Sequence, residues 1–451
     1  MSYDETIIDQ AVRVGQQART DFLDLRGDQG GVVLSAVAGA GKSYFISETV
    51  GIARDHEMRV AVAAPTNEQA FGLVTSIAEL NPSVTVTYVP ANNVALPAAN
   101  LRANVVTARP PRAAARAEVV VGTLDKLSDA FIREDLPDFD GLLIDESFQA
   151  DSARYYAAAA IAPVHLAVGD GGQIEPFSTV QAAERWRGLD ENPLQTAVGV
   201  LCRNHPQTPV HRFPITRRLD PRAIPVVRCF YAPEHHFGAA VLPGVRKMRL
   251  HDAVAPTDRL RRIDGALDLA AADGWTHLEL PDAAVLTCDP DSIRLIVECV
   301  ARLRDRAPQL RCERNPHWHA LQPQRIAVGV SHNDQKDLLR VELDQVGLGD
   351  VVVNTANKLQ GLEFDVVVCW HPLAGLPEAD GFHLEPGRAA VLLTRHRHAC
   401  IVVGRQGDRE LVEGVPPATP AFLGHDPDPV LDGWGVHQDV FAALELFRIA
   451  L

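Results

Sequence analysis

Lysine is scarce in this chain: only five of its 43 basic residues are lysines. Acidic residues outnumber basic ones by 58 to 43, and the formal net charge of −15 repels nucleic acid at long range. The charge lowers the expectation of a nucleic-acid partner but is compatible with one, because basic residues can be confined to one groove.

Paired cysteines are missing as well. Seven cysteines are scattered singly, with no C-x-x-C pair, which disfavours a disulfide framework and a zinc ribbon. Cys312, His317 and His319 offer only three local metal ligands, so we expect a plain loop there.

Long apolar segments are also missing. No uninterrupted apolar stretch could span a bilayer, and the N-terminus is acidic, unlike the basic and then apolar start of a secretory signal. We therefore expect a cytoplasmic protein with no membrane partner. At 451 residues, 46% hydrophobic and 22% charged, the chain suits two or three globular domains.

A repeated pattern of apolar strand, polar or glycine loop and helical stretch runs through both halves. It predicts an α/β fold with parallel sheets and helices on both faces. In the first half we expect strands at 32–34, 59–64, 119–121, 142–144 and 165–168. In the second half we expect strands at 284–287, 326–330, 351–353, 366–369, 390–393 and 401–403, with Asp289-Pro290 capping a helix.

The pattern becomes irregular between residues 176 and 211, where Pro193, Pro206 and Pro209 interrupt it. We place a domain boundary there, giving domains 1–205 and 206–451. Residues 81–116 are rich in Ala, Pro and Asn, and we interpret them as an excursion from the first sheet that is too short for a large inserted domain.

Residues 36–43 read Ala-Val-Ala-Gly-Ala-Gly-Lys-Ser and follow an apolar run. A buried strand, a small-residue loop and Lys-Ser are the pattern of a phosphate-binding loop. Gly39 and Gly41 let backbone N–H groups face a phosphate chain, with Ala40 between them. Ala36 stands where the first glycine of such a loop is usual.

The residues after the loop complete this prediction. Lys42 would place its charge on the β and γ phosphates, and Ser43 would offer a hydroxyl to Mg²⁺. Tyr44 would open a helix whose positive end adds to the anion site. The structural alternative is a turn that contains Gly-Lys-Ser by chance.

Two further strand ends carry polar residues suited to phosphate chemistry. Asp145 and Glu146 end a buried strand, where Asp145 would hold the metal and Glu146 would accept a proton from the attacking water. Gln173 follows a glycine-rich loop and could bond the γ-phosphate. Solvated strand caps and a simple turn are the structural alternatives.

Polar residues at two other strand ends suit the phosphates of a bound strand. Pro65, Thr66 and Asn67 close one strand and open a helix, and Thr123 closes a second strand. Simple helix caps explain these residues equally well.

The order of these motifs resembles the first RecA-like domain of superfamily 1 helicases. The second half resembles the nonsense-decay-helicase-like branch: residues 216–221 (Thr-Arg-Arg-Leu-Asp-Pro) followed by Phe230-Tyr231 are similar to its Gln-Tyr-Arg-Met-His-Pro…Phe-Tyr motif. Residues 353–365 look like the fifth motif and 388–397 like the sixth, with 401–404 as its usual sequel. The resemblance spans residues 30–404 and implies two tandem RecA-like domains.

The resemblance assigns roles in the second half. Arg218 and Arg395 would reach across an interdomain cleft to the γ-phosphate, although Arg217 stands where the family has Tyr. Gly361 and Glu363 would contact the nucleotide, Glu363 at its ribose. The remaining implied residues are Thr355 and Gln360 on the strand-binding side and Gln16 or Gln17 as the reader of adenine.

The implied function is an ATP-dependent helicase or translocase that uses ATP and Mg²⁺ on single-stranded DNA or RNA and moves 5′→3′. The accessory insertions of the family are absent or cut down within 81–116, which bears on processive unwinding more than on translocation. A nucleic-acid-binding ATPase switch is the first alternative. A small-molecule kinase, which would not need the motifs of the second half, is the second.

Overall fold

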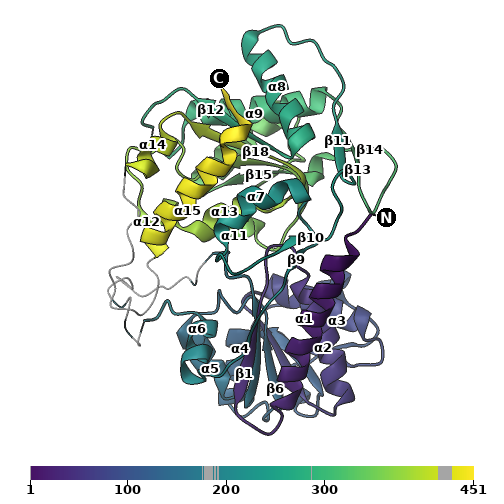
Figure 1. Ribbon diagram of the computed structural model, residues 1–451. Helices are drawn as coiled ribbons and strands as arrows, with labels where there is room; N and C mark the ends of the chain where they lie inside the picture. The colour runs from purple at the N-terminus through teal and green to yellow at the C-terminus, as the bar shows by residue number, and fades with distance from the viewer. Residues whose placement is uncertain are drawn as a thin grey trace.

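The computed structural model describes residues 2–174, 176, 186, 189, 192–285, 287–414 and 429–451, without the side chains of 429–432. Two α/β lobes, each built on its own parallel sheet, lie one above the other (Figure 1). None of the described helices is both long and apolar enough to cross a membrane.

The first lobe contains an eight-stranded sheet in the order β4-β3-β5-β2-β6-β7-β1-β8, with all pairs parallel. Its strands are β1 (Gly30–Ser35), β2 (Val60–Ala64), β3 (Val86–Val89), β4 (Val105–Thr107), β5 (Val119–Thr123), β6 (Gly141–Ile144), β7 (Val164–Gly169) and β8 (Val210–Arg212). Its helices are α1 (Glu5–Asp24), α2 (Lys42–Asp55), α3 (Asn67–Leu80), α4 (Leu124–Ile132), α5 (Ser152–Ala159) and α6 (Ala197–Asn204), with the 3₁₀ turns η1 (Ala98–Asn100) and η2 (Pro111–Ala114).

Alternate side chains of the buried strands point to opposite faces of this sheet. On one face, Val32 and Leu34 join a core with residues of α1, α2 and α3. On the other face, Val33 joins a core with residues of α4, α5 and α6. Both faces are therefore covered, as parallel sheets require.

The second lobe contains a six-stranded parallel sheet in the order β16-β15-β17-β18-β12-β19. Its strands are β12 (Trp275–Leu280), β15 (Ile326–Val330), β16 (Val352–Thr355), β17 (Phe364–Trp370), β18 (His396–Arg405) and β19 (Arg448–Ala450). Its helices are α7 (Ile224–Val227), α8 (Asp258–Asp273), α9 (Pro290–Asp305), α10 (Asn333–Gln345), α11 (Ala356–Leu359), α12 (Gly381–Leu384), α13 (Pro386–Leu393), α14 (Asp408–Glu413) and α15 (Pro429–Leu444), with the 3₁₀ turns η4 (Pro221–Ala223), η5 (Arg228–Phe230), η6 (Pro323–Arg325) and η7 (Glu445–Phe447).

Two small sheets complete the described structure. One pairs β9 (Ile215–Thr216) with β10 (Gly238–Ala239), and the other is antiparallel in the order β11-β13-β14. The strands of the antiparallel sheet are β11 (Lys247–Arg249), β13 (Gln309–Arg311) and β14 (His319–Ala320).

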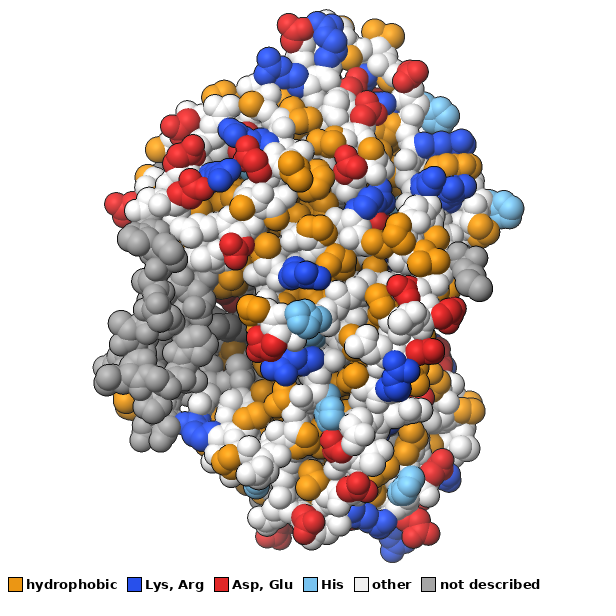
Figure 2. Space-filling model, in the orientation of Figure 1, with side chains coloured by type: hydrophobic (Ala, Val, Ile, Leu, Met, Phe, Trp, Pro, Cys, Tyr) orange, Lys and Arg blue, Asp and Glu red, His pale blue; other side chains and the backbone are white. Residues whose placement is uncertain are grey.

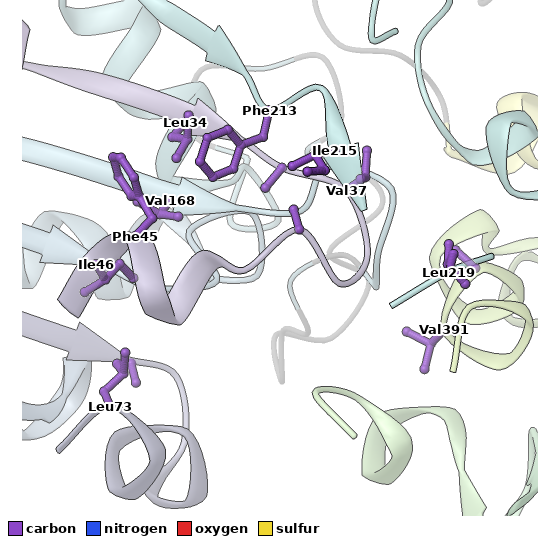
Figure 3. Packing of buried hydrophobic residues seen from close by; sticks show 14 of the residues in the cluster. Leu34, Val37, Phe45, Ile46, Leu73, Val168, Phe213, Ile215, Leu219 and Val391 are labelled. Atoms are coloured by element: carbon purple, nitrogen blue, oxygen red, sulfur yellow. The ribbon is translucent and has the colours of Figure 1, made fainter. Parts of the chain in front are cut away.

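The segment that connects the lobes is anchored in both cores. Phe213 packs edge-on against Phe45 of α2, with ring centroids 5.6 Å apart. Leu219 lies a few residues further on, close to Val391 of the second lobe, and both are fully buried (Figure 3). The lobes are thus joined by a continuous apolar core, which fixes how the faces of the cleft meet.

Most of the expected strands form, but three expectations fail. Residues 81–116 do not leave the sheet: β3 pairs with β5, and β4 with β3, so this segment extends the sheet edge. Residues 390–393 belong to helix α13, and the described residues of 284–287 form no strand. A short apolar run that is buried on every side fits a helix as well as a strand, which explains the error in α13.

The first sheet also continues past residue 205, because β8 at Val210–Arg212 pairs with β1. The domain boundary that the sequence places at 205/206 therefore precedes the last strand of this sheet.

Candidate nucleotide site

The phosphate-loop pattern follows strand β1, which lies between β7 and the edge strand β8, into helix α2. The N–H of Ala36 donates to the carbonyl of Gly169 at 2.8 Å, so Ala36 continues the ladder between β1 and β7. Alanine is tolerated here because this position extends a strand and needs no left-handed backbone.

Two glycines of the loop adopt the left-handed backbone that favours glycine. Gly39 has φ +74° and Gly41 has φ +99°. A side chain at Gly39 would also collide with the Cβ of Arg218, which the connecting segment places over the loop. Gly41 is the N-cap of α2, so Lys42 and Ser43 stand in the first turn of a helix whose N–H groups attract anions.

Lys42 lies among carboxylates. Its Nζ is 3.3 Å from Glu146 Oε1, and both side chains are nearly buried. Burial by itself lowers the pKa of Lys42, but Glu146, Asp170 and Asp145 outweigh it and raise the pKa above the ordinary value. The Lys42 ammonium therefore stays charged although it is nearly buried, and a group that binds phosphate must be charged.

The two carboxylates after β6 differ in their surroundings. Asp145 accepts the N–H of Glu146 at 3.0 Å, and burial together with the charge of Glu146 raises the pKa of Asp145 to about 7. Glu146 has a left-handed backbone, φ +50°, and its buried Oε2 has no hydrogen-bond partner among the described residues. The two carboxylates and the Ser43 hydroxyl are oxygen donors of the kind that Mg²⁺ and its bound water take.

The loop after β7 is held by the second half of the chain. Gln173 donates to Asp170 and accepts a hydrogen bond from Gln360 Nε2 at 3.0 Å. Tyr231 accepts the N–H of Ala38 at 2.9 Å, and its hydroxyl is 3.3 Å from Asp170 Oδ2. The loop after β7 therefore links the phosphate loop of the first lobe to residues of the second half of the chain.

Gly387, at the start of α13, packs directly on this loop. A Cβ there would collide with the backbone of Gln173 and Ile174. Such close approach between two backbones from different lobes requires the smallest residue. The lobes are in tight contact at this point.

Arg218 and Arg395 are the two predicted arginines that reach the cleft. Arg395 is fully buried, and it donates from Nε to the carbonyl of Val391 and from Nη2 to Thr394 Oγ1. Burial and the nearby charge of Arg218 lower the pKa of Arg395 to about 9. Its Nη1 and the Nε of Arg218 are buried without hydrogen-bond partners among the described residues.

An unpaired buried cation is costly, and two such cations beside each other repel. Arg218 Nε comes no closer than 3.7 Å to its nearest carboxylate, Glu363 Oε2, and burial lowers its pKa. The arrangement fits an anionic ligand that would pair with both guanidinium groups.

A buried ion network supports Arg218 from the second lobe, and sequence reasoning missed it. Arg397 bonds Glu363 at 3.2 Å and Glu313 at 2.6 Å, and Glu313 bonds Arg246 at 2.8 Å. Arg246 donates to the carbonyls of Arg218 and its preceding residue. The partners lie 28 to 84 residues apart, so no local spacing reveals them.

These groups surround a cavity of about 300 Å³ between the lobes. Twelve predicted site residues line it: Gly39, Ala40, Gly41, Lys42, Ser43, Tyr44, Glu146, Gln173, Arg218, Gly361, Glu363 and Arg395. Arg217 and Arg314 line it too, the second without having been predicted. Asp145 lies beside the cavity, next to Glu146.

Gln17 is not brought to this cavity. It lies on α1, where its amide donates to Asp21 Oδ1 at 2.7 Å on the exposed side of the helix. The mouth of the cavity carries Tyr44, Arg217 and Arg314 instead.

A second depression of about 460 Å³ contains the predicted strand-binding residues of the first lobe, Pro65, Thr66, Asn67 and Thr123. Thr66 and Thr123 cap α3 and α4 and accept N–H groups at 3.3 and 3.2 Å. Three acidic residues, Glu68, Asp125 and Asp129, share the wall with one cation, Lys126.

On the second lobe, Thr355 ends β16 and caps α11 without a side-chain bond. Gln360 follows α11 and points to Gln173, so it lies at the contact between the lobes.

We call the depression on the first lobe that contains Pro65, Thr66, Asn67 and Thr123 the strand-end pocket.

Fold and site together define a chain with two tandem RecA-like domains that share one phosphate-loop cleft. Residues 285–407 match the family model of the AAA domain. The match lies within the second lobe. The two parallel sheets confirm the predicted α/β fold with two parallel-sheet domains in tandem. No curated protein matches the chain.

Solved structures with a similar fold include two viral helicases. The PRRSV helicase has a TM-score of 0.42 and 14% identity, with 86% of this chain and 54% of that chain covered. The complex of Arterivirus nonstructural protein 10 (helicase) with DNA has a TM-score of 0.42 and 12% identity, covering 88% and 65%. S. cerevisiae Dbp5 bound to RNA and ADP BeF3 has a TM-score of 0.40 and 12% identity, covering 97% and 89%. The chain thus spans about half to two thirds of the viral chains.

Proposed function

We propose that this chain is an ATP-dependent superfamily 1 helicase or translocase that acts on single-stranded nucleic acid and moves 5′→3′. The observation that carries the proposal is the cleft itself. One wall supplies a phosphate loop with Lys42. The facing wall supplies Arg218 and Arg395, each with one buried guanidinium nitrogen that has no hydrogen-bond partner among the described residues. A triphosphate between the walls would pair with both sets of charges.

In this proposal Ser43 and Asp145 would hold Mg²⁺, which would neutralise charge on the phosphate oxygens. A divalent cation also favours the ionised form of Asp145. Glu146 accepts a proton from the attacking water through its free Oε2, as the water bonds to the γ-phosphorus and the bond to the β-phosphate oxygen breaks. Lys42, Arg218 and Arg395 stabilise the charge that spreads over the γ-phosphoryl group.

The two lobes then couple hydrolysis to strand movement. Gln173 bonds Gln360 across the lobes, so loss of the γ-phosphate beside Gln173 would loosen that contact. The strand-end pocket on one lobe and Thr355 on the other would hold the strand's phosphates. Alternate opening and closing of the cleft would change these contacts and move the strand.

The test is the ATPase rate with and without single-stranded DNA and RNA of equal length, followed by displacement of a strand from tailed duplexes. A motor shows stimulation by at least one nucleic acid and displacement or translocation. Stimulation without displacement or translocation would favour an ATPase switch. An ATPase that neither nucleic acid stimulates would contradict the proposal.

A further inference from the structure

The small antiparallel sheet β11-β13-β14 has two different faces. In its register Met248 lies opposite Leu310, and both are buried in the core of the second lobe. Lys247 opposite Arg311 and Arg249 opposite Gln309 occupy the other face, because neighbouring residues of a strand alternate. This outer face is turned to solvent.

The outer face is basic and carries an aromatic ring. The guanidinium carbon of Arg249 lies 4.3 Å, and that of Arg311 5.2 Å, from the ring centroid of Trp318. Among the described residues, no carboxylate pairs with Lys247, Arg249 or Arg311. Figure 2 shows the blue and orange side chains gathered at the place of this sheet in Figure 1.

The strands and the β13–β14 loop contain a single acidic residue, Glu313, and its side chain is 3% exposed and paired with Arg246 and Arg397. A local excess of positive charge therefore faces solvent in a chain whose formal net charge is −15. Cations placed around an indole are the combination that holds the phosphates and stacks the bases of an unpaired strand.

We infer that the outer face of β11, β13 and β14, with Trp318, is a second binding surface for single-stranded nucleic acid, separate from the strand-end pocket. The inference rests on the proposed function, which supplies the strand. Unpaired strands fit this surface better than duplex, because the indole needs an exposed base.

The surface is connected to the nucleotide cavity through one loop. Between β13 and β14, Glu313 holds Arg397 and Arg246, while Arg314 lines the cavity and lies 3.4 Å from Glu363. A strand held on the outer face would therefore restrain the loop that positions the charged wall of the cleft.

The test compares two double variants of the full chain with fluorescently labelled single-stranded DNA and RNA of equal length. One is Arg249→Ala with Arg311→Ala, and the matched control is Arg13→Ala with Arg294→Ala, two exposed helical arginines elsewhere. The first should bind at least tenfold more weakly at low salt. Its plot of log affinity against log salt should lose about 1.4 from its slope, which corresponds to two phosphate contacts. The control should keep the wild-type slope.

Trp318 distinguishes stacking from charge. Trp318→Ala should weaken strand binding about 5- to 100-fold, and Trp318→Phe should retain most of it, because the ring is kept. The ATPase rate without nucleic acid serves as the folding control and should stay at the wild-type level in both arginine variants.

Equal affinities of the Arg249/Arg311 and Arg13/Arg294 variants, in a protein that binds strands, would overturn the inference and leave the proposed function standing. Preferential loss of duplex binding or of binding to an acidic peptide, with strand binding kept, would also overturn it. An unaltered chain that binds no strand at all would instead contradict the proposed function, and the inference with it.

Discussion

The nucleotide cleft and the strand-end pocket were both predicted from polar residues at strand ends, yet they differ physically. In the cleft, Glu146, Arg218 and Arg395 keep buried polar atoms without partners among the described residues. In the strand-end pocket, Thr66 and Thr123 already accept helix N–H groups, and the buried atom without a hydrogen-bond partner in the described part of the chain, Asn67 Oδ1, is neutral. The comparison teaches that buried, unsatisfied charge indicates a ligand more strongly than polarity at a strand end.

The largest expected effect is in the cleft. Lys42→Ala removes the ammonium that Glu146 and Asp170 keep charged, so we expect ATP hydrolysis to fall by about 10³-fold or more. Steady-state ATPase measurements check this. Lys126→Ala, which removes the cation of the strand-end pocket, is the matched control and should hydrolyse ATP nearly normally without nucleic acid. Hydrolysis that survives Lys42→Ala would mean that the site is elsewhere.

The second expected effect concerns the ion network behind the cleft. Glu313→Gln leaves Arg246 and Arg397 buried with a neutral partner, and we expect a loss of about 3 kcal/mol of unfolding free energy. Chemical denaturation checks this. An unchanged midpoint would show that the network does not support the wall that carries Arg218.

The stability that Glu313 contributes through this network should depend on pH. Although burial opposes it, bonding to Arg246 lowers the pKa of Glu313 to about 2, below the ordinary 4.5. The stabilisation is therefore complete above pH 4.5 and is lost as the pH falls towards 2. Glu313→Gln should lack this part of the acid dependence.

Buried histidines test whether unsatisfied polar atoms always mark a ligand. Burial lowers the pKa of His437 and of His277 to about 4, and both lie in the second lobe away from the cleft. Below pH 6.5 these two histidines bind protons in the unfolded chain but stay neutral in the folded chain. The free energy of unfolding should therefore fall as the pH drops from 6.5 to 4. Thermal unfolding at pH 7 and pH 5 measures the fall.

His437→Leu should reduce the loss of unfolding free energy between pH 7 and pH 5 by about 2 kcal/mol. It should not change ATP hydrolysis at pH 7. An equally steep dependence in the variant would show that His437 does not contribute to the acid sensitivity. The expected result would show that buried neutral nitrogens without hydrogen-bond partners lower stability in acid without marking a ligand site, unlike the charged groups of the cleft.

The smallest effect is expected in the strand-end pocket. Thr66→Ala removes the capping box of α3 and should cost about 1 kcal/mol of stability, with little change in ATP hydrolysis measured without nucleic acid. Strand affinity decides whether Thr66 is more than a cap. A loss of affinity no larger than in a Thr75→Ala control on the same helix would reduce Thr66 to a capping residue.

Much of the site was predictable from the sequence because its chemistry is local. The phosphate loop and Asp145-Glu146 each follow an apolar strand, and the structure places both at the same edge of the sheet. Arg218 and Arg395 came from the resemblance alone, since nothing near them in the chain shows that they face the loop. Glu313 and Arg246 were missed because their pairing spans 67 residues.

The fold shows the same division. Strands with a continuous run of β-branched residues, such as Val119–Val121 of β5, were found from composition. Residues 390–393 were assigned to a strand, but Pro386 starts a helix there and burial on all sides hides its period. Residues 86–89 were treated as an excursion although β3 pairs with β5. Tertiary pairing decides such edges, and local composition does not record it.

The most direct test of the shared cleft is Arg395→Ala, measured for ATP binding and turnover in the same preparation. We expect kcat to fall about 10³-fold while the dissociation constant for ATP changes less than tenfold, because Arg395 acts on the charge of the transition state. Thermal unfolding should show a folded protein. A variant that is folded and turns over ATP at the wild-type rate would contradict a nucleotide site built from both lobes.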